Sequence, residues 1–170
     1  MNSAPIQSMS HPLEMFGYTS HALMVPPFPP RSVLMLGYGT GTVYRLIDQV
    51  WGPVNMTGVD VARPDCDLSD VTFAQMTASR FVHEYKGDPY DFVVVDLYNG
   101  NRIPEFVFYE SFVDELSRLC GKLLAVNLTF YNFLDFKVFD RRFIIDCVKR
   151  VNCGNDQDDE DKVMFLRRRP

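Results

Sequence analysis

Short apolar runs alternate with segments of helical periodicity from Val33 onward. This alternation is typical of an α/β domain, in which helices cover both faces of a mostly parallel sheet. Five apolar runs predict parallel strands at residues 33–36, 56–59, 71–74, 91–96 and 122–128. Helices with apolar residues three and four positions apart are predicted after the first, third and fourth strands. The pattern therefore predicts a doubly wound sheet.

The predicted helices differ in how well the sequence delimits them. The helix after the first strand has an apolar stripe that includes Val43, Ile47 and Val50, and the helix after the fourth strand is expected to run from about Phe108 to Gly121. Only ten residues, 61–70, separate the second strand from the third, whereas a helical crossover needs about a dozen. The fold is therefore expected to be shortened after its second strand, with a single helical turn or none.

The two ends of the chain have their own patterns. Residues 143–151 and 162–167 predict two antiparallel strands, joined by a strongly acidic turn that is expected to be solvated. Residues 1–30 are rich in proline, serine and methionine and are expected to form an irregular arm. Residues 31–170 are then a single domain whose sheet ends in a C-terminal antiparallel hairpin.

Composition narrows the classes of function. A chain of 170 residues that is 46% hydrophobic fits one domain, and its net charge of -5 argues against a nucleic-acid partner. The four cysteines form no C-x-x-C pair and no apolar run is long enough to span a membrane, so a reduced cytoplasm and no membrane partner are expected. The three histidines are isolated, and no metal site is predicted. Aromatic residues, 14% of the chain, are expected in the core, with a homodimer surface as the alternative.

The most informative segment is SVLMLGYGTGT, residues 32–42, where an apolar strand runs into glycines 37, 39 and 41. Glycines after a strand permit left-handed backbone angles, and the N–H groups of the following helix favour a negatively polarised ligand. A nucleotide-like ligand is therefore the first hypothesis, and a tight turn without a ligand is the second. The spacing departs from the dinucleotide fingerprint and lacks a P-loop lysine, which argues against NAD and ATP.

Two aspartates end predicted strands near this loop. Asp60 follows the second strand and Asp96 ends the fourth. Ligands of doubly wound sheets bind outside the carboxyl ends of the strands, where an acid at the end of the second strand can accept hydrogen bonds from ribose hydroxyls. Each aspartate alone is equally well explained as a turn residue, but the two together with the glycine loop favour a binding site.

The motifs PPRSVLMLGYGTGT, TGVD, YDFVVVDLYNGNRIP and GKLLAVNL occur in this order within residues 18–130. In these motifs the chain resembles the spermidine synthase-like (polyamine aminopropyltransferase) branch of the Rossmann-like class I S-adenosylmethionine-dependent methyltransferase fold. The resemblance implies a cofactor, S-adenosylmethionine or its decarboxylated form. It also implies transfer of a methyl or aminopropyl group to a small amine or polyamine.

The resemblance implies roles for particular residues. Asp96 is the candidate base for the amine, with Tyr98 as a second catalytic candidate, and Tyr18, His21 and Asn99 are candidates for substrate binding. The candidate cofactor-binding residues are Gly37, Tyr38, Gly39, Thr40, Gly41, Asp60, Val61, Thr77, Ala78 and Asp96.

Two positions depart from the family pattern. Asn99 stands where aminopropyltransferases have a second aspartate, so one charge for holding an ammonium is missing. Thr77-Ala78 stands where the family has Asp-Ala beside the adenine. These departures motivate the alternative of a catalytically inactive or regulatory nucleoside-binding protein. An NAD-linked reductase is disfavoured by the glycine spacing.

Overall fold

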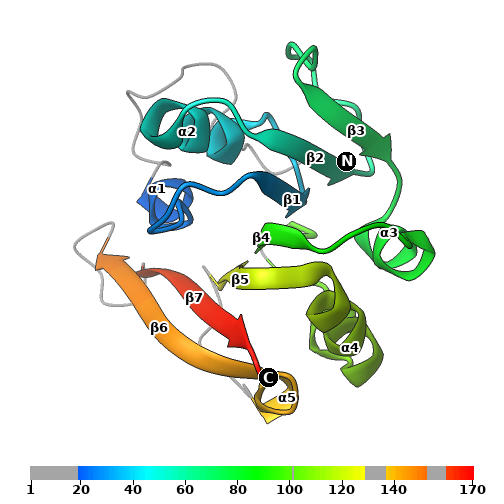
Figure 1. The fold of residues 1–170 in the computed structure, drawn as a ribbon, viewed down its shortest axis with the longest axis vertical. Helices are drawn as coiled ribbons and strands as arrows, with labels where there is room; N and C mark the ends of the chain where they lie inside the picture. Colours follow the sequence, from blue (N-terminus) through cyan, green and yellow to red (C-terminus); the bar gives the residue numbers. More distant parts are fainter. Residues whose placement is uncertain (1–18, 101, 129–136, 153–159) are drawn as a thin grey trace.

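A seven-stranded sheet forms the centre of the computed structural model, which describes residues 19–100, 102–128, 137–152 and 160–170 (Figure 1). The strand order is β3-β2-β1-β4-β5-β7-β6. The first five strands pair in parallel and β7 pairs antiparallel with both β5 and β6, which confirms the predicted doubly wound sheet with a C-terminal hairpin. The strands are β1 Ser32–Leu36, β2 Asn55–Asp60, β3 Val71–Gln75, β4 Tyr90–Val95, β5 Cys120–Asn127, β6 Phe143–Asn152 and β7 Glu160–Arg168.

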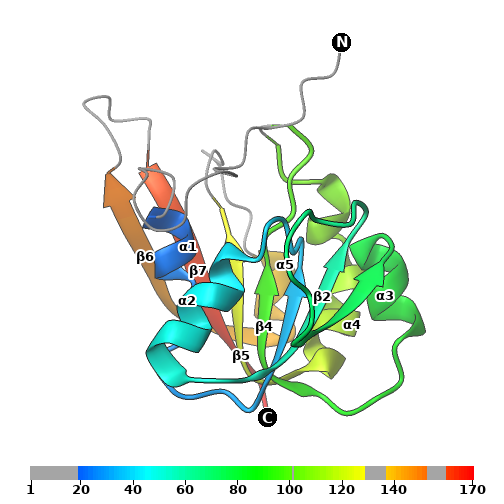
Figure 2. The ribbon, with the colours of Figure 1, turned by 90° about the horizontal axis from the view of Figure 1, so that it is seen from above.

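Helices cover both faces of the sheet. The helices α1 and α2 lie on one face, and α3, α4 and α5 lie on the other (Figure 1). The arrowheads of β2, β3 and β4 point toward the same edge, so their carboxyl ends open on one side of the molecule (Figure 2). The helices are α1 Thr19–Leu23, α2 Thr42–Trp51, α3 Ala78–Glu84, the 3-10 helix η2 Glu105–Phe108, α4 Glu110–Leu119 and α5 Lys137–Asp140.

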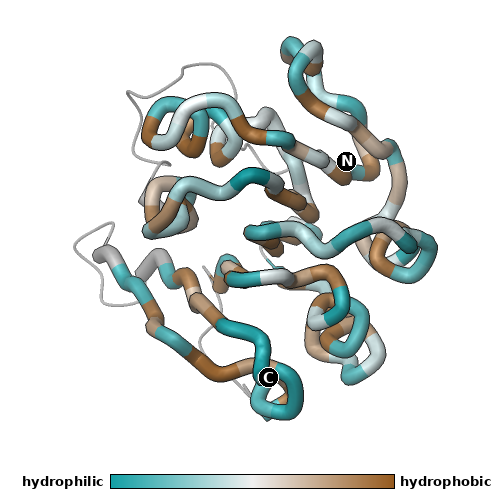
Figure 3. The backbone as a smooth tube through the Cα atoms, in the orientation of Figure 1, coloured by the Kyte–Doolittle hydropathy of each residue, from teal (hydrophilic) through white to brown (hydrophobic). Residues whose placement is uncertain are grey.

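Alternate residues of the strands build two apolar layers. In β4, Phe92 and Val94 pack in the layer beneath α1 and α2, whereas Val93 and Val95 pack in the layer beneath α3 and α4. Complete burial of each such side chain stabilises the fold by about 1.5–3 kcal/mol. Hydropathy alternates along the turns of α2 and α4, as expected for helices with one buried face (Figure 3).

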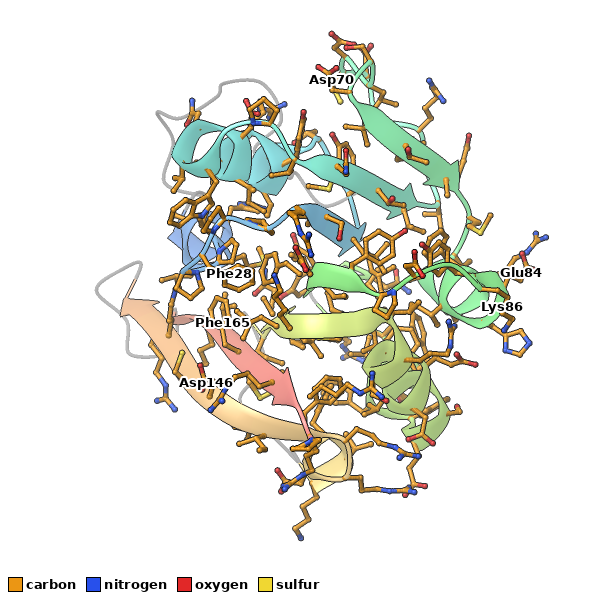
Figure 4. The ribbon with its side chains drawn as sticks, in the orientation of Figure 1. Phe28, Asp70, Glu84, Lys86, Asp146 and Phe165 are labelled. Carbon is orange, nitrogen blue, oxygen red and sulfur yellow. The ribbon has the colours of Figure 1, made fainter. Side chains whose placement is uncertain are left out.

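The hairpin β6–β7 completes the sheet with the same alternation. Phe165 of β7 lies in the layer on the α1 side, where Phe28 packs against the same cluster (Figure 4). Asp146 of β6 is exposed and accepts a hydrogen bond from Arg167 Nε at 2.7 Å. The edge strand β6 thus presents Asp146 to solvent and buries Phe143 in the core, while Ile144 remains 39% exposed.

The structure corrects several predicted boundaries. The helix α1 lies within the arm that was expected to be irregular, and Val50 of α2 is 56% exposed rather than part of a buried stripe. The prediction of a single helix from Phe108 to Gly121 is wrong at both ends. Phe108 belongs to η2, and Gly121 lies in β5, because α4 ends at Leu119 and the strand begins directly after it.

The link between β2 and β3 contains no helix in residues 61–70, as its length predicted. None of the helices in the described part of the chain is long and apolar enough to cross a lipid bilayer.

Candidate functional site

The glycine loop adopts the backbone angles that its sequence predicts. Gly37, Gly39 and Gly41 have φ values of 86°, 54° and 77°. The N–H groups of Gly37 and Tyr38 both donate to the carbonyl oxygen of Val59, at 2.9 and 3.1 Å, which ties the loop to the end of β2. A Cβ atom on Gly37 would overlap the backbone carbonyl of Asp96, so the loop approaches β4 as closely as only glycine allows.

Tyr38 supports this loop from the core on the α1 and α2 side of the sheet. Its side chain is only 2% exposed, and its ring packs edge-on against Phe73 with 5.8 Å between the ring centroids. Burial raises the pKa of its phenol well above the ordinary value, so the ring stays neutral. Tyr38 borders a small recess beside His21, but most of the residue belongs to the core. The side chain therefore serves mainly to hold the loop, a role that its place in the glycine motif did not indicate.

Asp60 braces the same loop from the end of β2. Its Oδ2 atom accepts a hydrogen bond from the Gly39 N–H at 2.9 Å, and its Oδ1 atom accepts one from the Ala62 N–H at 3.2 Å. A carboxylate can accept about four hydrogen bonds. Asp60 therefore orients the glycine loop and keeps acceptor capacity for a further ligand.

Asp96 lies directly after β4 and is only 6% exposed. Its Oδ1 atom accepts a hydrogen bond from Asn127 Nδ2 at 2.9 Å, and its Oδ2 atom lies 3.7 Å from His21 Nε2. Residues from β4, β5 and α1 thus meet at one carboxylate. Asn127 was missed in the sequence, although it is a polar residue at the end of an otherwise apolar strand.

The two aspartates open into one cleft, as the loop pattern predicted. The cleft has an empty volume of about 570 Å³, which includes space open to solvent. Its wall comprises residues from the ends of β1, β2, β3 and β4 and from the segments that follow them. These residues are Gly37, Val59, Asp60, Val61, Met76, Thr77, Ala78, Asp96, Leu97, Tyr98, Pro104 and Phe106.

A smaller recess also borders Asp96. It is bordered by His21, Met35, Tyr38, Gly39, Thr40, Thr42 and Asp96. Asp96 lines both the cleft and the recess near the glycine loop. His21, predicted as a substrate-binding residue from its place before the first strand, is therefore close to Asp96 in space.

Other predicted site residues have different surroundings. Asn99 is exposed, and its backbone pairs with that of Arg102 in a turn, so it is not among the residues that line the cleft. Thr77 lines the cleft, but its hydroxyl also accepts a hydrogen bond from the Arg80 N–H at 3.3 Å and caps α3. Val61 borders the mouth and is 65% exposed. Tyr18 lies outside the described residues.

The residues of the cleft fit a nucleoside cofactor. Asp60 offers carboxylate oxygens for ribose hydroxyls, while Ala78 and Met76 offer apolar surface for a base. The backbone of Gly37 lies against the carbonyl group of Asp96, so the floor of the cleft at this point has no room for a side chain. No group of three or more His, Cys, Asp or Glu side chains converges as a metal site within the described ranges.

Comparison with known protein sequences found a match over part of the chain. No protein-family model matches the chain. A probable polyamine aminopropyl transferase from Bifidobacterium longum is 34% identical over 97 residues, covering 51% of this chain and 22% of that protein. The match thus spans less than a quarter of the relative's length.

Solved structures share the fold at low sequence identity. A 1,6-didemethyltoxoflavin-N1-methyltransferase from Burkholderia thailandensis, solved with 1,6-didemethyltoxoflavin and S-adenosylhomocysteine, is similar with a TM-score of 0.67 at 15% identity, covering 89% of this chain and 77% of that one. A probable spermidine synthase from Corynebacterium glutamicum has a TM-score of 0.58 at 12% identity, covering 81% of this chain and 55% of that one. The chain therefore has the class I S-adenosylmethionine-dependent methyltransferase fold, and its sequence resembles a polyamine aminopropyl transferase.

Proposed function

We propose that this chain binds an S-adenosyl nucleoside and transfers a methyl or aminopropyl group from it to a small amine. One observation carries the proposal. Asp60 and Asp96 line the same cleft at the carboxyl edge of the sheet, and the backbone of Gly37 lies between the strands that hold them. The fold and the resemblance to an aminopropyl transferase support this assignment.

The nucleoside end of the cofactor would be held by residues that follow β2 and β3. Asp60 would accept hydrogen bonds from the ribose hydroxyls, and Ala78, Met76 and Val61 would contact the base. Because the hydroxyl of Thr77 already caps α3, the base would receive weaker polar recognition here than from an aspartate. The cofactor would supply a carbon activated by a neighbouring sulfonium.

Asp96 would act on the acceptor. An amine must be unprotonated and aimed at the activated carbon to act as a nucleophile. The Asp96 carboxylate, held by Asn127, would attract the protonated amine and accept its proton. Tyr98 lines the same cleft and would order the acceptor by packing or by a hydrogen bond from its hydroxyl.

A nucleoside-binding protein without transfer activity is the second candidate. Asn99 brings no charge and is not among the residues that line the cleft, and Thr77 is engaged in a helix cap. Both features would weaken recognition of a polyamine or of adenine while leaving the nucleoside cleft in place.

Product analysis distinguishes the two candidates. Purified protein is incubated with S-adenosylmethionine or its decarboxylated form and a panel of small amines. S-adenosylhomocysteine would report methyl transfer and methylthioadenosine would report aminopropyl transfer, and either product should be lost in Asp96→Asn. Ser117→Ala is the control, because Ser117 is a buried polar residue of α4 that bonds within its own helix. Formation of neither product, with nucleoside binding intact, would favour the second candidate.

A further inference from the structure

Asp96 and Asn127 end two neighbouring apolar rows on one face of the sheet. On the α1 and α2 face, Phe92 and Val94 precede Asp96 on β4, and Leu123 and Ala125 precede Asn127 on β5. The parallel register pairs Val95 with Val126. Asp96 and Asn127 are the next residues of the two chain segments, so they lie at the same level of the sheet. Two polar side chains therefore stand side by side where the rows reach the cleft.

Burial makes their pairing necessary. Asp96 is 6% and Asn127 is 5% exposed, and a buried carboxylate or amide without a partner is strongly destabilising. The hydrogen bond from Asn127 Nδ2 to Asp96 Oδ1 meets part of this need. If packing alone determined position 127, an apolar residue would continue the row, as leucine and alanine do at positions 123 and 125.

Contacts from two sides fix the direction of the carboxylate. Asn127 of β5 holds Oδ1, while His21 of α1 faces Oδ2 at 3.7 Å. Contacts to both oxygens restrict rotation of the carboxyl group. Neighbouring residues that restrain a charged group in this way fix its orientation toward a ligand. The restrained carboxylate lines both the cleft and the recess.

We propose that Asn127 is a positioning residue that holds the Asp96 charge so that the site favours a cationic S-adenosyl ligand over its uncharged thioether product. This inference rests on the proposed function. Its consequence is release of product, because S-adenosylhomocysteine lacks the positive charge that Asp96 attracts in S-adenosylmethionine. Asn127 acts through Asp96 and needs no contact with the ligand.

Binding measurements test this role without turnover. Dissociation constants of S-adenosylmethionine and S-adenosylhomocysteine are measured by calorimetry for the unmodified protein, for Asn127→Leu and for the control Ser117→Ala. The unmodified protein and the control should prefer S-adenosylmethionine. In Asn127→Leu this preference should fall about tenfold, because the Asp96 charge is no longer held toward the ligand, while the affinity for S-adenosylhomocysteine changes little.

A double-mutant cycle separates positioning from general structural damage. In an Asp96→Asn background the charge is absent, so adding Asn127→Leu should leave the ratio of the two affinities unchanged. This background also removes the buried carboxylate charge from which Asn127→Leu would take the Asn127 hydrogen bond. If Asn127→Leu alone does not fold, Asn127→Ser takes its place, because its shorter side chain also loses the 2.9 Å bond.

The outcomes are distinguishable. Parallel weakening of both ligands in Asn127→Leu, or an unchanged ratio, would overturn the assignment of Asn127 and leave the proposed function standing. A change of ratio that persists in the Asp96→Asn background would also overturn it. Failure of the unmodified protein to bind either nucleoside would overturn the proposed function itself.

Discussion

The ring of Tyr38 occupies the space above Gly58 that a side chain at position 58 would fill. A Cβ atom on Gly58 would lie 2.9 Å from Tyr38 Cγ and would overlap the ring edge. A Cβ atom on Gly41 would meet the same ring, 2.6 Å from its hydroxyl oxygen. One aromatic residue thus links the glycine loop to the middle of β2.

Gly58→Ala is expected to destabilise the fold by about 1–3 kcal/mol, because the added methyl displaces the Tyr38 ring from a packed core. Chemical denaturation measures the change. In a Tyr38→Ala background the same substitution should cost much less, since the ring is gone. Equal losses in both backgrounds would show that Gly58 and Tyr38 do not compete for this space.

Gly37→Ala should be more harmful than Gly100→Ala. Both glycines have positive φ, 86° and 63°, but a Cβ atom on Gly37 would overlap Asp96, whereas one on Gly100 meets no described atom within 4 Å. The backbone strain is shared, so the difference in unfolding free energy, about 1–3 kcal/mol, isolates the contact with β4. Similar stability of the two variants would contradict the close approach of the loop to β4.

Asp91 is expected to give the fold a pH-dependent stability. Burial alone would raise the pKa of this carboxyl, but the Arg31 N–H at 2.9 Å and the Lys122 ammonium at 3.0 Å outweigh it and hold the pKa below 3.8. A lowered pKa stabilises the folded chain above pH 3.8, and this stability is lost as the pH falls through the folded-state pKa.

Lys122→Met should therefore lower stability by about 1 kcal/mol at neutral pH, since half of the lysine is solvated, and by less below pH 3.8. Denaturation curves of both proteins at pH 7 and pH 3 provide the comparison. A difference that grows on acidification would show that the lysine does not act through the Asp91 carboxylate.

The described cysteines should differ strongly in reactivity. Burial raises the pKa of the Cys120 thiol to about 12, whereas Cys147 on β6 is exposed. Because the thiolate is the reactive form, iodoacetamide at pH 8 should label Cys147 quickly and Cys120 only after unfolding. Mass spectrometry of peptides measures both rates, and rapid labelling of Cys120 in the folded protein would contradict its burial at the start of β5.

The sequence predicted the sheet because buried parallel strands are short apolar runs, as in the valines of β4. The predictions from sequence were wrong where tertiary contacts, and not the local residue pattern, determine the structure. A five-residue helix such as α1 is too short for a periodic signal, and Gly121 resembled a helix end although α4 passes directly into β5.

The candidate site was predictable in part for the same reason. Glycines and aspartates at strand ends mark the cleft, because the carboxyl ends of parallel strands share one edge. Asn127 could have been found from strand alternation, as a polar residue on a row that is apolar on β4 and β5. The burial of Tyr38 could not have been predicted from the sequence, because the glycine motif is equally compatible with a ring that points outward to a ligand.

Calorimetry with S-adenosylmethionine determines whether the cleft binds an S-adenosyl nucleoside through Asp60. Asp60→Asn should weaken binding at least about tenfold while keeping an oxygen acceptor for the Gly39 N–H. The control is Asp70→Asn, which removes the same charge from an exposed residue that is not part of the cleft wall (Figure 4) and should bind like the unmodified protein. Absence of binding by the unmodified protein, or equal affinity in Asp60→Asn, would show that Asp60 does not hold an S-adenosyl nucleoside in this cleft.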